Sequence, residues 1–223
     1  MAMTVITKDT TALSDIELSE MADLCANGTV GFDVDYLSEQ REQWVLISLA
    51  REGAKLRGYS FITLERIGGT PAMLIGPALI DRNSKSDQTL KALLTDQFRR
   101  ALLAFPDEDV LLGARLTTAD GFRAFLGCTD IVPRPGYKPT GEDRAWGRRL
   151  AKRFGSEKAI DDKTFIMSVS APVVGGLDYV SSKGVLPDGA VEAFKGVKSA
   201  KGERLVVFGW AMAEHLAAGK IPK

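Results

Sequence analysis

The run Pro71-Ala-Met-Leu-Ile-Gly-Pro-Ala-Leu-Ile80 is apolar throughout, and the polar turn Asp81-Arg-Asn-Ser-Lys-Ser-Asp87 follows it directly. Apolar side chains then recur at helical spacing across residues 87–105, at Leu90, Leu94, Phe98, Ala101 and Phe105. A strand that is apolar on both faces usually lies inside a sheet covered on each side. The stretch therefore predicts a central strand, a polar turn and an amphipathic helix. Such a turn often binds ligands, because the first amides of a helix lack partners within it.

Two further strands are predicted just before this run. Residues 45–50 are mostly apolar, and residues 57–67 alternate between two faces. Gly68-Gly69 is a hairpin signal, so residues 71–80 should pair back on residues 57–67. Because proline cannot donate to a strand ladder, Gly76-Pro77 predicts a bulge inside the third strand. The expected arrangement is an antiparallel meander.

Further helices and strands are predicted before and after the meander in the sequence. Ser14 and Glu17 have the spacing of a capping box at the start of a helix. We expect a second helix over residues 35–43, and later helices over residues 119–126 and 142–154. The other predicted strands are residues 4–7, 110–117, 130–133 and 164–170. The predicted fold class is α/β (α+β), a mixed, mostly antiparallel sheet of six or seven strands within a domain of residues 4–170.

The composition changes after Pro172, where glycine and proline become frequent. We expect residues 171–223 to form a C-terminal extension that ends in a helix over residues 203–218. That helix would be apolar on every side, which is typical of a buried helix. A homodimer in which it covers the partner, with Phe208 and Trp210 at the contact, is therefore predicted. The alternative is that residues 172–189 fold back over the helix within one chain.

Composition restricts the class of protein. The 223 residues contain 45% hydrophobic and 26% charged residues, as in ordinary globular domains. Basic and acidic residues balance at 29 each, which gives no general case for binding nucleic acid. Residues 1–50 carry 2 basic and 9 acidic groups, whereas residues 51–160 carry 19 and 13, so an anionic ligand would suit the middle of the chain. The alternative is a solvated surface of mixed charge.

The cysteine content, the first residues and the lengths of the apolar runs predict where the protein is located in the cell. Cys25 and Cys128 are the only cysteines, too few for a disulfide framework, which favours a reduced cytoplasmic protein. The first residues do not have the pattern of a secretory signal. No apolar run reaches the roughly 18–20 residues that a membrane span needs, so no membrane partner is expected.

The order of elements resembles the Gcn5-related N-acetyltransferase (GNAT) superfamily over residues 4–170. Gly76-Pro77 lies where that family bulges its fourth strand to make a slot for pantetheine. Ala119-Asp-Gly-Phe-Arg-Ala-Phe-Leu-Gly127 resembles the short helix that ends in glycine in the family. The resemblance implies transfer of an acyl group from acetyl-CoA or another acyl-CoA, or from an acyl carrier protein, to an amine. The acceptor would be a small-molecule amine or an amino acid, and no metal would be needed.

Several residues depart from the family pattern. In the phosphate loop, Lys85 takes the basic position, but Gln88 and Leu90 stand where small residues let amides approach a pyrophosphate. Asp87, as an N-cap, would bring negative charge to the same place. Arg123 replaces the tyrosine that protonates the leaving thiolate, and guanidinium cannot act as that acid. These departures favour a second hypothesis, a non-catalytic GNAT-like module that binds a small ligand or a partner protein.

The resemblance also implies a cofactor site. Leu79 and Ile80 would offer backbone groups to the pantetheine arm. Lys85, Ser86 and the start of the helix would meet the phosphates, with Arg82 beside them. The alternative interpretation of Arg82 and Lys85 is two solvated loop charges. An open slot beside Gly76 would support the enzyme, whereas a filled slot would support the module.

Candidate catalytic and substrate-binding residues lie on the predicted strands and the short helix. Glu65 and Asp81 end adjacent strands, and in register they could together deprotonate an amine, although strand ends are often acidic for solubility alone. Tyr59 and Arg123 are the candidates for contacting the substrate. As the alternative, Arg123 is an ordinary surface arginine. Cys128 is more typical of a structural cysteine than of a nucleophile.

The only histidine, His215, is expected to be structural. Any multi-histidine metal site or histidine-based catalytic triad would have to include it. The sequence therefore predicts no metal site.

Overall fold

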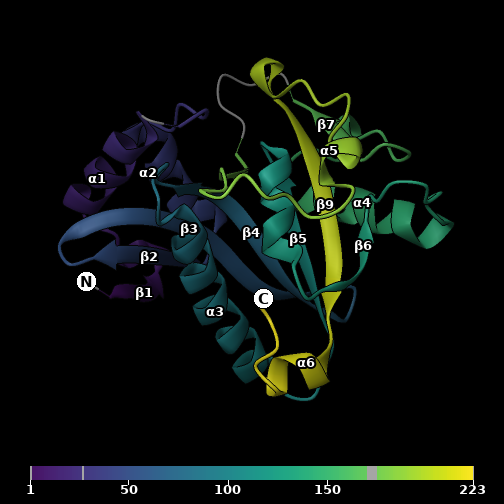
Figure 1. The fold of residues 1–223 in the computed structure, drawn as a ribbon, viewed down its shortest axis with the longest axis horizontal. Coiled ribbons are helices and arrows are strands. Elements are labelled where there is room, and N and C mark those ends of the chain that lie inside the picture. Colours follow the sequence, from purple (N-terminus) through teal and green to yellow (C-terminus); the bar gives the residue numbers. More distant parts are fainter. Residues whose placement is uncertain (1, 27, 170–174, 223) are drawn as a thin grey trace.

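The computed structural model describes residues 2–26, 28–169 and 175–222, which form one mixed sheet with helices on both faces (Figure 1). The strands are β1 (Met3–Asp9), β2 (Leu46–Glu52), β3 (Lys55–Ile67), β4 (Thr70–Ile80), β5 (Val110–Leu116), β6 (Thr129–Val132), β7 (Ile166–Ser168), β8 (Leu177–Asp178) and β9 (Glu203–Ala211). The helices are α1 (Asp15–Cys25), α2 (Val34–Gln43), α3 (Ser86–Ala104), α4 (Gly141–Arg153), α5 (Ala190–Ala193) and α6 (Ala213–Ala217). Four short 3₁₀ helices are η1 (Thr10–Ala12), η2 (Ala119–Phe125), η3 (Glu157–Ala159) and η4 (Ser199–Lys201).

The strand order is β1-β2-β3-β4-β8-β5-β9-β6, and β7 pairs with β9. The pairs β1–β2, β2–β3, β3–β4, β5–β9, β6–β9 and β7–β9 are antiparallel, whereas β4, β5 and β8 run parallel to one another. The predicted class, a mixed and mostly antiparallel sheet flanked by helices, is confirmed. The described sheet has nine strands rather than six or seven, because β8 and β9 come from the part of the chain expected to form an extension.

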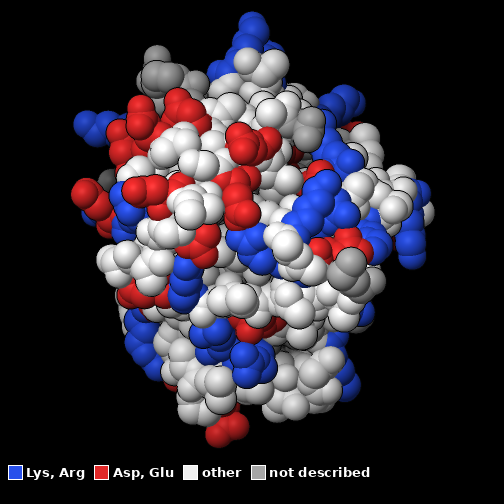
Figure 2. Space-filling view, turned by 90° about the vertical axis from the view of Figure 1, so that its left-hand side faces the viewer, with Lys and Arg blue, Asp and Glu red and all other residues white. Residues whose placement is uncertain are grey.

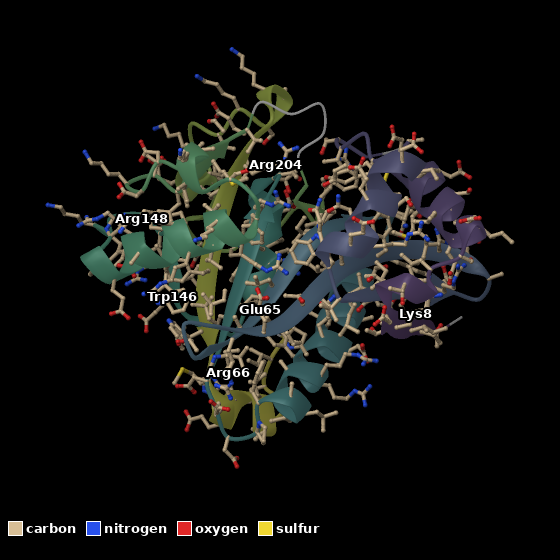
Figure 3. The ribbon with its side chains drawn as sticks, turned by 180° about the vertical axis from the view of Figure 1, so that it is seen from behind. Lys8, Glu65, Arg66, Trp146, Arg148 and Arg204 are labelled. Carbon is tan, nitrogen blue, oxygen red and sulfur yellow. The ribbon has the colours of Figure 1, made fainter. Side chains whose placement is uncertain are left out.

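The central strand behaves as its composition predicts. Every residue of β4 from Pro71 to Ile80 is buried. α3 covers one face of the sheet and α4 the other, as the opposite views of Figures 1 and 3 show. The helix after the polar turn begins at Ser86, with Lys85 at the N-cap position and no side-chain cap. Asp87 is therefore not the N-cap, and its carboxylate is left to bind elsewhere.

The bulge predicted in β4 is present. Ser60 pairs with Ala78 and Ile62 with Ile75, so Gly76 and Pro77 together oppose one residue of β3. A β-carbon on Gly76 would lie 2.5 Å from the nearest ring atom of Trp44. The indole therefore fills the space directly beside the bulge.

The helix predicted over residues 203–218 is wrong. Residues 203–211 form β9, which lies between β5 and β6, and only α6 is helical. A short run that is apolar on all sides suits a strand covered on both faces as well as a buried helix, so periodicity could not separate the two. The run Leu205-Val-Val-Phe208 is buried within the sheet, which removes the surface on which the homodimer was predicted. Trp210 packs against Trp146 of α4, with ring centroids 6.1 Å apart.

The separation of acidic residues 1–50 from basic residues 51–160 in the sequence appears only in part on the surface. Figure 2 shows the face that carries α1 and α2, where acidic side chains gather toward the upper part and basic side chains lie beside and below them. Among the described residues, no helix is both long and apolar enough to cross a membrane.

Candidate functional site

The slot expected beside β4 is filled by the chain itself. β4 and β5 pair side by side over residues 72–75 and 111–114, and beyond this region β8 lies between them. The amide of Ala78 donates to the carbonyl of Gly176 at 3.0 Å, and the amide of Thr117 donates to the carbonyl of Leu177 at 3.2 Å. Backbone groups that a bound ligand would need on both strands are therefore used by residues 175–182, which we call the inserted segment.

The inserted segment also covers the start of α3. The Asp87 carboxylate accepts hydrogen bonds from the Tyr179 hydroxyl at 2.6 Å and from the Ser182 amide at 2.9 Å. The Ser86 hydroxyl donates to the carbonyl of Val180 at 2.9 Å. The helix N-terminus that was expected to meet phosphates is thus bound to the protein's own residues.

The opposite face of the inserted segment is held by a buried carboxylate. Successive strand side chains point to opposite faces, so Asp178 turns away from α3. It is 1% exposed and accepts from the Thr29 amide at 2.7 Å and from Arg82 at 3.3 Å. Thr117 approaches the same carboxylate at 3.4 Å. Contacts on both faces therefore fix the inserted segment between β4 and β5.

We expect Asp87→Ala to loosen the inserted segment and to lower the free energy of unfolding by about 1.5–3 kcal/mol, because hydrogen bonds to a charged acceptor are lost. Faster amide exchange at residues 179–182, together with urea unfolding, would measure the effect. Asp162→Ala is the matched control, because that carboxylate pairs with Arg148 at an exposed position and should change stability by less than about 0.5 kcal/mol. Equal effects of the two substitutions would contradict the role given to Asp87.

Acid should weaken the same contact. Burial raises the pKa of Asp87, but hydrogen bonds from Tyr179, Ser182 and Ser181 lower it by more, so the net pKa lies below the usual 3.8. A carboxyl with a depressed pKa stabilises the fold above its unfolded pKa, and this contribution is lost as the pH falls through its folded pKa. The protection of the Ser182 amide, taken relative to its intrinsic exchange rate at each pH, should therefore fall below about pH 4 in the wild type, and Asp87→Ala should remove this part of the pH dependence.

The residues predicted to bind the cofactor do lie together, at the end of β4 and the start of α3, but they are engaged with the protein. Leu79 pairs with Asp178 of β8, and Ile80 pairs with Gly58 of β3. Arg82 contacts Asp178, as described above. Lys85 forms an ion pair with Glu52, whose pKa is lowered to about 2 by hydrogen bonds from Lys85 and Arg57.

Glu65 and Asp81 lie at opposite ends of the β3–β4 hairpin. Glu65 pairs in register with Ala72, whereas the amide of Asp81 bonds to the carbonyl of Arg57. At about 3.3 Å per residue they are separated by roughly 25 Å, so the prediction of a joint general base is wrong. In antiparallel strands the end of one meets the beginning of the next. Asp81 follows the end of β4 that lies beside β8, and Arg204 of β9 lies at this same end of the sheet. Figure 3 shows Glu65 far from Arg204.

Those two carboxylates have structural partners instead. Glu65 accepts from Arg153 of α4 at 2.7 Å. Asp81 accepts from Arg57 at 2.9 Å and lines a shallow hollow of about 310 Å³. Both carboxylates are therefore occupied by ion pairs rather than directed at a common substrate.

The predicted substrate-binding residues are also structural. Tyr59 is fully buried, its hydroxyl lies 3.0 Å from the Cys25 sulfur, and burial holds its pKa well above 10. Arg123 donates to the carbonyl of Val185 at 2.9 Å and lies 3.7 Å from Asp87. Burial raises the pKa of Cys128 to about 12, which disfavours a thiolate nucleophile.

His215 is on α6 rather than on a long apolar helix, 3.7 Å from Glu214. Within the described ranges, no cluster of three metal-ligating side chains occurs. A separate cavity of about 540 Å³ borders η2, β6 and α5, and none of the predicted site residues lines it.

Sequence reasoning missed the residues that fill the slot. Trp44 follows α2 and reaches the bulge from more than thirty positions earlier in the chain. Asp178 and Tyr179 lie in a stretch that reads as a loop, and two residues of β8 are too few to show strand periodicity. Arg115 carries a buried charge within an otherwise apolar strand, which is the one signal that could have been noticed.

No protein-family model matches the chain, and no curated protein matches it by sequence. Similar solved structures include the ribosomal-protein-S18-alanine N-acetyltransferase from Escherichia coli, which is 12% identical with a TM-score of 0.41, over 62% of this chain and 86% of that chain. An acetyltransferase of the GNAT family from Streptococcus pneumoniae is 10% identical with a TM-score of 0.37, over 60% and 91% of the two chains. The putative acetyltransferase yncA from Salmonella typhimurium, solved with acetyl-CoA, is 17% identical with a TM-score of 0.33, over 62% and 87%.

Proposed function

We propose that this chain is a GNAT-like binding module that does not load coenzyme A into the slot beside β4. The observation that supports this proposal is the inserted segment, which hydrogen-bonds to Ala78 on β4 and to Thr117 directly after β5. An acyl-CoA arm would have to replace these bonds and would meet the Asp87 carboxylate at the start of α3. Trp44 fills the neighbouring space at Gly76. The ligand of such a module is a small molecule or a partner protein.

The departures of the phosphate loop support the same proposal. Gln88 stands where the resemblance requires a small residue, and Leu90 belongs to the hydrophobic core at 5% exposure. Arg123, in the position of the family's proton donor, binds a backbone carbonyl and lies near Asp87. No group in the described residues near the slot is therefore assigned to protonating a leaving thiolate.

The second candidate is an N-acyltransferase that uses an acyl-CoA or an acyl carrier protein and an amine acceptor. The bulge at Gly76-Pro77 favours it, because a bulge at this place is what the GNAT resemblance implies for pantetheine binding. For this function the inserted segment would have to leave the space between β4 and β5. The two candidates therefore differ in one measurable property, which is whether coenzyme A binds.

The test is calorimetric titration of acetyl-CoA, a longer acyl-CoA and free coenzyme A into the intact wild-type chain and into Asp87→Ala. The binding module predicts no saturable heat for either protein at millimolar ligand. Binding to the wild type would reject the proposal. Binding to Asp87→Ala alone would also reject it, because a retained coenzyme A site would then lie beneath the inserted segment.

A further inference from the structure

The cavity between η2, β6 and α5, which we call the η2 cavity, has room for a small ligand. Its volume of about 540 Å³ falls within the range of about 300–1,000 Å³ that is usual for small-molecule sites. None of its lining residues belongs to the inserted segment, to β4 or to β5. Figure 1 shows α5 and β6 on the side of the molecule away from α1 and α2. The η2 cavity is therefore separate from the filled slot.

Contacts between distant segments hold the walls of the η2 cavity in place. Arg123 of η2 donates to the carbonyl of Val185 at 2.9 Å, just before residues 187–190, which line the cavity. A β-carbon on Gly189 would lie 2.8 Å from the Pro135 ring, so the loop after β6 packs directly against the start of α5. The cavity is therefore formed before any ligand arrives, as most small-molecule sites are.

Apolar side chains form much of the lining of the η2 cavity. Phe122 and Phe125 of η2 are buried, and Leu126 and Ile131 are half-buried. A lining of this kind favours a ligand with an apolar body, because the apolar surfaces of both are removed from water when the ligand binds.

Two carboxylates without partners accompany this apolar lining. Asp130 and Asp188 line the η2 cavity and are exposed, and within the described residues neither side chain accepts a hydrogen bond or forms an ion pair. The cation in the lining, Arg134, is engaged elsewhere. Its Nη1 donates to the carbonyl of Ile131 at 2.9 Å, and its guanidinium lies 3.7 Å from the centre of the Tyr137 ring, outside the lining. The η2 cavity therefore carries an excess of negative charge.

The charge and the lining together specify the class of ligand. An ionised carboxylate only accepts hydrogen bonds, so its best partner is a donor that carries positive charge. A metal ion fits less well, because the described residues contain no cluster of three metal-ligating side chains. An organic ammonium group on an apolar body matches both the carboxylates and the apolar walls.

We propose that the η2 cavity binds a small organic cation, with its ammonium group at Asp130 and Asp188 and its apolar body against Phe122 and Phe125. The inference rests on the proposed function in that it names the class of small molecule that the module binds. The site is distinct from the slot beside β4, so binding in the η2 cavity does not require the inserted segment to move.

Three probes share an indole body and differ in the charge at the end of the side chain: tryptamine, which is an ammonium ion at pH 7, neutral tryptophol and anionic indole-3-acetate. Each is titrated calorimetrically into the intact chain, with sodium chloride adjusted to hold the ionic strength constant. Tryptamine should give saturable heat. Tryptophol should bind roughly 10-fold more weakly, because a neutral hydroxyl replaces the charged donor, and indole-3-acetate should bind more weakly still.

Asp130→Asn and Asp188→Asn should each weaken tryptamine binding roughly 3- to 10-fold and leave tryptophol binding unchanged. Asn suits the backbone at residue 130, where φ is 48°, because Asn adopts positive φ as readily as Asp does. Glu192→Gln is the matched control. It removes an exposed carboxylate from α5 that does not line the η2 cavity, so the affinity for tryptamine should change by less than about 2-fold.

Three results would overturn the cation site. These are no saturable binding of tryptamine to the wild type, binding of tryptophol or indole-3-acetate as tight as that of tryptamine, and equal losses in Glu192→Gln and in the two cavity variants. Circular dichroism shows whether each variant is folded, and the three probes test the wild type without any substitution. Failure here is distinct from failure of the proposed function, because acetyl-CoA binding to the wild type rejects the module whether or not tryptamine binds.

Discussion

Trp44→Ala is expected to lower the free energy of unfolding by about 3–5 kcal/mol, among the largest effects of a single substitution in this chain. The indole is 4% exposed, its Nε1 donates to Gln40 at 3.2 Å, and its ring packs against Phe154. Removing it leaves a hollow next to Gly76, which the surrounding strands can close only in part. Urea unfolding followed by circular dichroism measures the change.

A double-mutant cycle links this effect to the bulge. Gly76→Ala should cost about 1–3 kcal/mol in the wild type, because the new methyl group would overlap the Trp44 ring. In the Trp44→Ala background the same change should cost much less, since the added methyl enters the hollow. Additive effects of the two substitutions would contradict the contact between Trp44 and the bulge.

Arg115→Met should raise the free energy of unfolding by about 1–4 kcal/mol. Methionine has a similar length and no charge to desolvate, whereas Arg115 is buried with one long hydrogen bond. Thermal unfolding is the measurement.

Arg148→Met serves as the control for loss of one positive charge. Arg148 is exposed, and its ion pair with Asp162 should contribute less than about 1 kcal/mol. A destabilised Arg115→Met protein would show that the guanidinium holds the fold together through its contact with Phe154.

The parts of the fold that were predictable from sequence depend on local pattern. The apolar run at residues 71–80, the hairpin at Gly68-Gly69 and the stripe of α3 each specify an element within a short window. The bulge at Gly76-Pro77 was predictable because proline removes a ladder hydrogen bond whatever its surroundings. These features establish the meander and its following helix.

The rest depends on contacts between distant residues. The run Leu205-Val-Val-Phe208 suits either a strand or a buried helix, and only its place between β5 and β6 decides. Glu65 and Asp81 end neighbouring strands, but antiparallel pairing puts them at opposite ends of the hairpin. The inserted segment has no local signal, because its conformation is set by Asp87 and by the backbone of β4 and β5.

The central claim is that residues 175–182 occupy the slot between β4 and β5. Hydrogen exchange at the amides of Ala78 and Thr117, followed by NMR with and without acetyl-CoA, tests it most directly, because both amides donate to the inserted segment. Slow exchange at both amides, unchanged by millimolar acetyl-CoA, is the expected result. Fast exchange of either amide in the free protein, or protection that appears only when acetyl-CoA is added, would contradict it.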